Sequence, residues 1–235
     1  MSNPNEDMPK SMAIVNGKPL IYHIMKIYSK YGYNDFILPL GYKGDKIKEY
    51  FINFEWKNSN FTKTTNANDI QIFDDTDKFR ITFIDTGINT MTGARIKRVS
   101  KYIDTDQFMV TYGDGLSNIN IDELIKFHNK KGKFCTLTGI QKKSQYGILE
   151  VENDIAKSFS EKEAMDGIVN GGFFVCNKEF LNYLSDDESC ILEKEPLKNL
   201  VEDGQLAVYP HTDIWISVDT HKDLVNANEI WKGDI

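Results

Sequence analysis

Residues 20–41 read LIYHIMKIYSKYGYNDFILPLG, and this stretch decides the class of fold. Its first half places apolar side chains at helical spacing and stops at Gly32, whereas DFILPL is a short apolar run of strand length. The same order recurs further along: GDKIKEYFINF predicts a helix, RITFIDTG a strand, GARIKRVSKYI a helix and FMVTYGDG a strand. Helices that alternate with short apolar strands predict a parallel sheet covered by helices on both faces.

The C-terminal half has a different character. After a predicted helix (IDELIKFHNKKGK) and strand (FCTLTGI), three short strand candidates follow quickly: YGILEVE, IAKSFSE and GGFFVCN. They predict a smaller mixed layer, with later helices in KEFLNYL, ILEKEPLKNLVEDG and THKDLVNANEIW. There is no internal repeat or low-complexity linker. We therefore predict one α/β domain over residues 1–235, with a doubly wound, mostly parallel, Rossmann-like sheet and a small mixed β elaboration in the C-terminal half.

Composition excludes several classes of protein. The chain has 28 Lys and Arg against 35 Asp and Glu, so its net charge of -7 provides no general attraction to nucleic acid polymers. Its apolar runs are far shorter than the roughly 20 residues of a membrane span. The start, MSNPNEDMPKSM, lacks the basic and then apolar pattern of a signal peptide, which predicts a cytoplasmic protein. The three cysteines show no CxxC spacing and are predicted to be reduced thiols.

Two aspartates follow predicted strands directly. In open parallel sheets, ligands bind beyond the carboxyl ends of the strands. Asp114 lies between Gly113 and Gly115 at the end of FMVTYGDG, and Asp219 ends DIWISVD. Carboxylates at such positions can hold a hard cation. A structural role is open for each at this point, because aspartate is common in glycine turns and Asp219 also stands where a helix N-cap is expected.

Further candidates are weaker when each is taken singly. Two lysines are candidates for binding an anion: Lys10 in MPKSM, and Lys162 in FSEKE beside Glu161. Each could equally be an ordinary solvated lysine. TMTGAR, residues 90–95, is a turn that opens a helix, where free N–H groups can receive a phosphate or a carbonyl. NGGFF, residues 170–174, is also compatible with a β-bulge.

Taken together, the order and spacing of these segments closely resemble the sugar-1-phosphate nucleotidyltransferase family. The resemblance runs from about Pro9 onward, and DTGINTMTGAR and EKEPLKNLVEDGQLAVY match its glucose-1-phosphate cytidylyltransferase branch best. It implies that the phosphate oxygen of glucose 1-phosphate attacks the α-phosphorus of CTP in line, releasing pyrophosphate and forming CDP-glucose for polysaccharide biosynthesis. It also implies a homo-oligomer, for which the aromatic residues of NFEWKNSNF are the predicted contact surface.

The resemblance also implies roles for individual residues. Asp114 and Asp219 are expected to hold Mg²⁺, and Lys10 to act with Asp114 in catalysis by contacting the triphosphate. Lys162 is expected to hold the sugar phosphate. The remaining implied contacts are Thr90, Ala94 and Gly113 along the nucleotide, and Glu161 and Asn170 at sugar hydroxyls.

The sequence departs from the family pattern in several places. K-P-K-P becomes DMPKS, with Met8 and Ser11 at the changed positions; Glu163 replaces the proline of E-K-P; and G-G-R is GAR. The family also opens with an apolar strand and a phosphate-cradling loop, L-A-G-G-x-G-T-R, and MSNPNEDMP contains neither. We therefore expect unpaired strand edges and poor CTP binding. The energetic cost of lacking this strand and loop is comparable to the whole net stability of a domain, about 5–15 kcal/mol. The open explanations are an upstream start, a degenerate non-catalytic relative, or a sheet closed by a partner subunit. A relative that uses UTP or dTTP is also open.

Overall fold

The computed structural model describes residues 8–64, 69–73, 77–143, 148–152, 155–160 and 165–232. Its α-helices are α1 (Leu20–Ser29), α2 (Gly44–Ile52), α3 (Phe54–Asn58), α4 (Thr92–Val99), α5 (Ile121–Lys131), α6 (Glu195–Glu202) and α7 (His221–Ile230). Three short 3-10 helices are η1 (Lys10–Met12), η2 (Ser100–Tyr102) and η3 (Lys178–Tyr183). The strands are β1 (Ile14–Val15), β2 (Lys18–Pro19), β3 (Asp35–Leu40), β4 (Phe61–Thr64), β5 (Asp69–Ile72), β6 (Arg80–Asp85), β7 (Gln107–Val110), β8 (Gly115–Ser117), β9 (Cys135–Lys143), β10 (Ile148–Glu152), β11 (Ile155–Ser160), β12 (Met165–Asn170), β13 (Phe174–Asn177), β14 (Leu206–His211) and β15 (Trp215–Ser217).

The alternation of helices and strands predicted from residues 20–41 onward is present. Helix α1 buries the apolar stripe that its sequence shows, and the chain turns at Gly32, whose φ of 86° suits a residue without a side chain, before it enters β3. One boundary was predicted wrongly: the helix expected over ILEKEPLKNLVEDG begins only at Glu195, where Pro196 occupies the first turn. Proline is favoured there because it has no N–H to donate.

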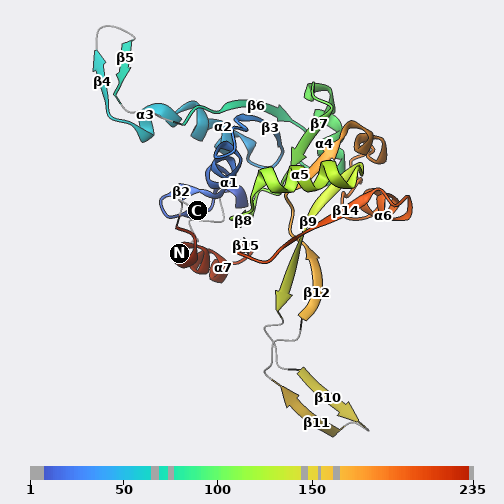
Figure 1. Ribbon diagram of the computed structural model, residues 1–235. Helices are drawn as coiled ribbons and strands as arrows, with labels where there is room; N and C mark the ends of the chain where they lie inside the picture. Colours follow the sequence, from blue (N-terminus) through green and yellow to red (C-terminus); the bar gives the residue numbers. More distant parts are fainter. Residues whose placement is uncertain are drawn as a thin grey trace.

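Among the described residues, the largest sheet has five strands. β13 pairs antiparallel with both β7 and β9, β12 pairs antiparallel with β9, and β14 runs parallel to β9. β3 and β6 form a separate parallel pair. The α/β class is as predicted: β3–β6 and β9–β14 are parallel, and the pairings of β13 with β7 and β9 and of β12 with β9 are antiparallel. The β4–β5 and β10–β11 hairpins lie away from the main body (Figure 1).

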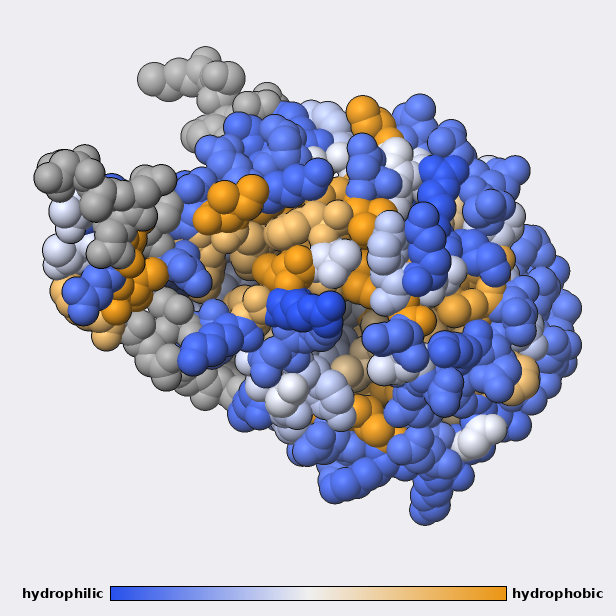
Figure 2. Space-filling view, turned by 90° about the horizontal axis from the view of Figure 1, so that it is seen from above, coloured by the Kyte–Doolittle hydropathy of each residue, from blue (hydrophilic) through white to orange (hydrophobic). Residues whose placement is uncertain are grey.

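Strands β3 and β7 each have a strand neighbour on one side only among the described residues. β3 pairs with β6, and β7 pairs with β13. Phe36, Ile37 and Leu38 of β3, and the apolar residues of β7, are only half-buried. Figure 2 shows apolar residues gathered in the middle of the face seen from above, inside a hydrophilic rim. Each of these two strands is therefore a sheet edge among the described residues.

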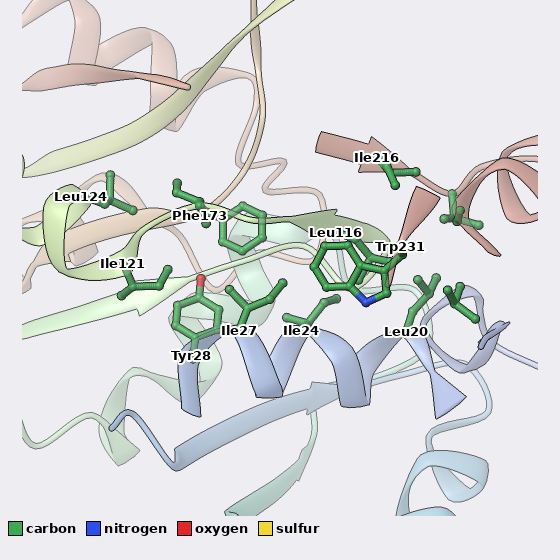
Figure 3. Packing of buried hydrophobic residues seen from close by; sticks show 14 of the residues in the cluster. Leu20, Ile24, Ile27, Tyr28, Leu116, Ile121, Leu124, Phe173, Ile216 and Trp231 are labelled. Carbon is green, nitrogen blue, oxygen red and sulfur yellow. The ribbon is translucent and has the colours of Figure 1, made fainter. Parts of the chain in front are cut away.

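The main core packs around α1 (Figure 3). Ile24 and Ile27 of α1 belong to the same buried cluster as Leu116, Phe173 and Trp231. Trp231 is 2% exposed, and its indole Nε1 donates a hydrogen bond to Nδ1 of His23 at 3.2 Å. The cluster therefore ties the C-terminal helix, β8 and β15 to the first helix, and it gives these two short strands a fixed base.

Three further expectations concern the predicted contact surface, the cysteines and membrane spans. Phe54 in the predicted contact surface is buried among rings that include Tyr22, Phe51 and Phe79, so it is not available; Phe61 is exposed, and the side chain of Trp56 lies outside the described residues. The cysteines are free thiols, as predicted, with two of them buried on β9 and β13. Within the described part of the chain, every helix is too short or too polar to cross a membrane.

We predict that acid weakens the fold through two buried histidines. Burial lowers the pKa of His23 and of His128 below the ordinary value of 6.5. Below pH 6.5 the unfolded chain therefore binds more protons than the folded chain, and stability falls as the pH drops through this window. We expect a loss of about 1–2 kcal/mol between pH 7.5 and 5.5, measured by urea denaturation.

The His128→Gln variant should show a smaller pH dependence. His128 contacts the hydroxyl of Thr136 at 2.8 Å and the amide oxygen of Asn177 at 3.1 Å, and glutamine keeps a polar group there that does not titrate. An unchanged slope between pH 7.5 and 5.5 in this variant would contradict the assignment to His128.

Candidate active site

Asp114 and Asp219 come together at one end of the β8–β15 pair. Gly115 lies opposite Ser217 in this antiparallel pair, and the N–H of Val218 donates to the carbonyl of Asp114 at 2.9 Å. Asp114 directly precedes β8 and Asp219 follows the end of β15, so the start of one strand lies beside the end of the other. The two were expected to meet at the carboxyl ends of parallel strands; they meet through an antiparallel pair instead.

Asp219 is oriented by its neighbours and does not cap the following helix. The N-cap of α7 is Thr220, which forms a capping box with Asp223. The Asp219 carboxylate accepts from Lys10 Nζ at Oδ1 and from the Ser217 hydroxyl at Oδ2, each at 2.8 Å. The alternative of an N-cap role for Asp219 is therefore wrong, and its carboxylate is instead bound by Lys10 and Ser217.

The charges in this cluster influence one another. Burial raises the pKa of Asp114, the charge of Asp219 raises it further, and Lys10 opposes the rise. The hydrogen bond to Asp219 raises the pKa of Lys10 in turn. The Lys10 and Asp219 side chains are 62% and 54% exposed, so their ion pair contributes only about 0–1 kcal/mol to folding. A half-buried carboxylate beside a second one opposes folding electrostatically, which is typical of a functional site.

The two aspartates line a cavity of about 330 Å³. Asn170, predicted to contact sugar hydroxyls, lines the same cavity. The other lining residues are Thr111, Tyr112, Gly115, Gly171, Phe173, Glu193, Trp215, Ser217. Sequence reasoning assigned no role to Tyr112, Glu193 or Trp215. A signal existed for Trp215, because it shares the period-2 alternation of Ser217 and Asp219 along one strand.

The NGGFF segment forms one wall through an unusual backbone. Gly172 has a φ of 75°, and a Cβ there would lie 2.9 Å from the Tyr112 ring. Phe173 also has a positive φ, 48°, which costs about 1–2 kcal/mol for a residue with a side chain. Its ring is 1% exposed and stacks on Tyr28, and this packing holds the strained turn in place.

The TMTGAR turn is placed differently from the expectation. The N–H of Met91 donates to the carbonyl of Glu188, and those of Gly93 and Ala94 donate to the carbonyl of Cys190. These donors are therefore occupied by the chain and are not free. Thr90 is buried, its hydroxyl donates to the carbonyl of Thr86, and neither Thr90 nor Ala94 lines the cavity. Their nucleotide-binding role stays a prediction.

The remaining candidates are placed as follows. Gly113 is exposed beside η1, where a Cβ would lie 3.3 Å from the Cβ of Ser11, and this brings the glycine turn close to Lys10. Glu161 and Lys162 lie outside the described residues, so their roles stay predictions. The structure thus brings Lys10, Asp114 and Asp219 into one cluster and places Asn170 in the cavity that the two aspartates line.

Two carboxylates and a lysine thus form one charged cluster beside a cavity of an α/β fold. The chain belongs to the nucleotidyl transferase family, whose family model matches residues 5–232. It is 49% identical over 231 residues to a protein of Bacillus subtilis (strain 168) named probable glucose-1-phosphate cytidylyltransferase, with 98% of this chain and 91% of that protein covered. It is 39% identical to the glucose-1-phosphate cytidylyltransferase of Salmonella typhi, over 95% of this chain and 88% of that one. The crystal structure of HddC from Yersinia pseudotuberculosis superposes with a TM-score of 0.67, at 24% identity and with 95% and 90% of the two chains covered. This last likeness supports the fold.

Proposed function

We propose that this protein is a glucose-1-phosphate cytidylyltransferase that converts CTP and glucose 1-phosphate to CDP-glucose and pyrophosphate. The observation that carries the proposal is the convergence of Lys10, Asp114 and Asp219 in one cluster beside the cavity that the two aspartates line, although Lys10 and Asp219 are 209 positions apart. The relatives named above support the choice of CTP and glucose 1-phosphate.

The residues of the cavity fit a bound Mg²⁺. Mg²⁺ in nucleotide enzymes is commonly held by one or two carboxylates together with substrate phosphates and waters. Asp114 and Asp219 supply two carboxylates, and the charge of Asp219 contributes to the raised pKa of Asp114, so a cation held by these residues would offset their repulsion. Among the described residues there is no group of three metal-ligating side chains. When bound, Mg²⁺ would neutralise charge on the α-phosphate.

The chain's own residues position the two substrates for in-line attack. Lys10 lies near both carboxylates and pairs with Asp219. When CTP enters, its ammonium group would leave this contact and bind the triphosphate. Ser217 keeps Asp219 oriented through its hydrogen bond to Oδ2. Asn170 lines the cavity, and its amide, which donates to Tyr112 and accepts from the Gly172 N–H, keeps one hydrogen and one lone pair for a sugar hydroxyl. Lys162, outside the described residues, is proposed to hold the sugar phosphate beside Glu161.

The test is exchange of labelled pyrophosphate into CTP in the presence of CDP-glucose and Mg²⁺. We expect exchange that depends on Mg²⁺ and on CDP-glucose. Exchange into UTP or dTTP, measured with UDP-glucose or dTDP-glucose in place of CDP-glucose, would instead assign another nucleotide. If none of the three nucleotides exchanges while glucose 1-phosphate still binds, the chain is a non-catalytic relative.

Two further features belong to the same proposal. We propose a homo-oligomer that works in the cytoplasm. The half-buried apolar edges of β3 and β7 support association, because an unpaired strand edge with partly exposed apolar side chains can be covered by a second chain.

A further inference from the structure

Three side chains form a second polar group in the cavity, apart from the aspartate pair. The Tyr112 hydroxyl donates to Glu193 Oε1 at 2.6 Å and accepts from Asn170 Nδ2 at 2.9 Å. The other oxygen of the same carboxylate, Oε2, accepts from the Thr92 hydroxyl at 2.9 Å. Glu193 is thus held from two sides by residues 81 and 101 positions away.

This arrangement leaves acceptor capacity on the carboxylate. A carboxylate has about four lone-pair positions, and Tyr112 and Thr92 use one on each oxygen. Glu193 is exposed and lines the cavity, and no lysine, arginine or histidine among the described residues forms an ion pair with it. A negative acceptor without a cation repels phosphate and attracts a hydroxyl hydrogen. The ligand group that suits it is therefore the hydroxyl of a sugar.

The neighbouring residues support a sugar site. The indole Nε1 of Trp215 donates to the carbonyl of Gly171 at 2.8 Å, which fixes the ring in the cavity wall. An aromatic ring with a few polar groups around it is the usual composition of a small-molecule pocket. Burial and the adjacent Glu193 carboxylate raise the pKa of Tyr112, so its hydroxyl remains a donor at neutral pH.

We propose that Glu193 is a sugar-specificity residue, which accepts a hydrogen bond from one hydroxyl of the hexose while Tyr112 and Thr92 hold its carboxylate in place. The inference rests on the proposed function and assigns a residue to the sugar half of that site. A site built to bind a hydroxyl disfavours the analogue that lacks it, because the oriented acceptor then loses its partner in the cavity.

The experiment measures binding by calorimetry for wild type and Glu193→Gln. The probes are glucose 1-phosphate and the set of its derivatives that each lack one hydroxyl. We expect the variant to bind glucose 1-phosphate about 10–100-fold more weakly, because it loses one hydrogen bond to a charged group. For one deoxy derivative, wild type and variant should bind within about 3-fold, because the partner hydroxyl is already missing.

Two further variants separate this role from a merely structural one. Glu195→Gln changes an exposed carboxylate two positions away that does not line the cavity, and it should bind every probe as wild type does. Tyr112→Phe keeps the ring but frees Glu193 Oε1, and it should weaken binding less than Glu193→Gln does. Binding of the same deoxy derivative should not change in this variant. This variant also serves if Glu193→Gln fails to fold.

The outcomes are distinct. Equal weakening for every derivative would mean that Glu193 only supports the fold, and it would overturn this inference while leaving the proposed function intact if pyrophosphate exchange is present. No binding of any sugar phosphate by the wild type would overturn both.

Discussion

Replacing Asp114 with asparagine is expected to lower pyrophosphate exchange into CTP by about 10²–10³-fold, the loss that removal of one preorganised electrostatic group produces. Asparagine keeps the shape of the side chain but removes the charge that, with Asp219, is proposed to hold Mg²⁺. The fold should remain intact, because Asp114 lies just before β8 at the cavity and belongs to none of the buried apolar clusters. Exchange assays at fixed, saturating Mg²⁺ and circular dichroism measure the two effects.

The same variant should be more stable than wild type at neutral pH. Burial and Asp219 raise the pKa of Asp114 above the ordinary 3.8, so the fold favours the protonated form. The contribution of protonated Asp114 to folding stability is present in full below pH 3.8, and it is lost as the pH rises through the folded-state pKa of this residue. Without Mg²⁺, we expect Tm of Asp114→Asn to exceed that of wild type at pH 7 and the gap to close toward pH 4.

Mg²⁺ provides the control for this stability difference. It should raise Tm of wild type and not that of Asp114→Asn, because only wild type has both carboxylates. Asp104→Asn, at an exposed position outside the cavity, should leave exchange and the Mg²⁺ response unchanged. A Mg²⁺ response that Asp114→Asn retains in full would place the metal elsewhere.

Replacing Lys162 with alanine is expected to raise KM for glucose 1-phosphate by about 100-fold and to change KM for CTP by less than about 3-fold. A lysine on a phosphate makes a charge-assisted hydrogen bond, whose loss corresponds to about 1.5–3 kcal/mol. The measurement is steady-state formation of CDP-glucose with each substrate varied in turn. Lys130→Ala, on the exposed side of α5, is the matched control for loss of one positive charge.

The ratio of the two effects decides the assignment. Equal losses for both substrates would place Lys162 between the nucleotide and the sugar phosphate, and a loss for CTP alone would move it to the nucleotide half. Both results would contradict its proposed role.

Local sequence pattern determined the class of this protein and part of its site. Helical spacing followed by a strand-length apolar run predicted α1 and β3, because amphipathic periodicity and glycine stops act over only a few residues. The glycine-flanked turn singled out Asp114, and the strand end singled out Asp219, because polar residues at strand ends are visible without any tertiary contact. The resemblance of its motifs to the family indicated CTP and glucose 1-phosphate as the substrates.

The tertiary structure alone decided how these residues meet. Asp114 and Asp219 converge through the antiparallel pairing of β8 with β15, and no local pattern specifies which strands will pair. The selection of Thr220 as the N-cap left Asp219 for the site, although both residue types can cap a helix. Tyr112 and Glu193 gained their shared hydrogen bond across 81 positions. Such contacts depend on packing of segments distant in sequence, so the helices and strands follow from the sequence by itself, whereas the cavity and its second polar group exist only in the folded chain.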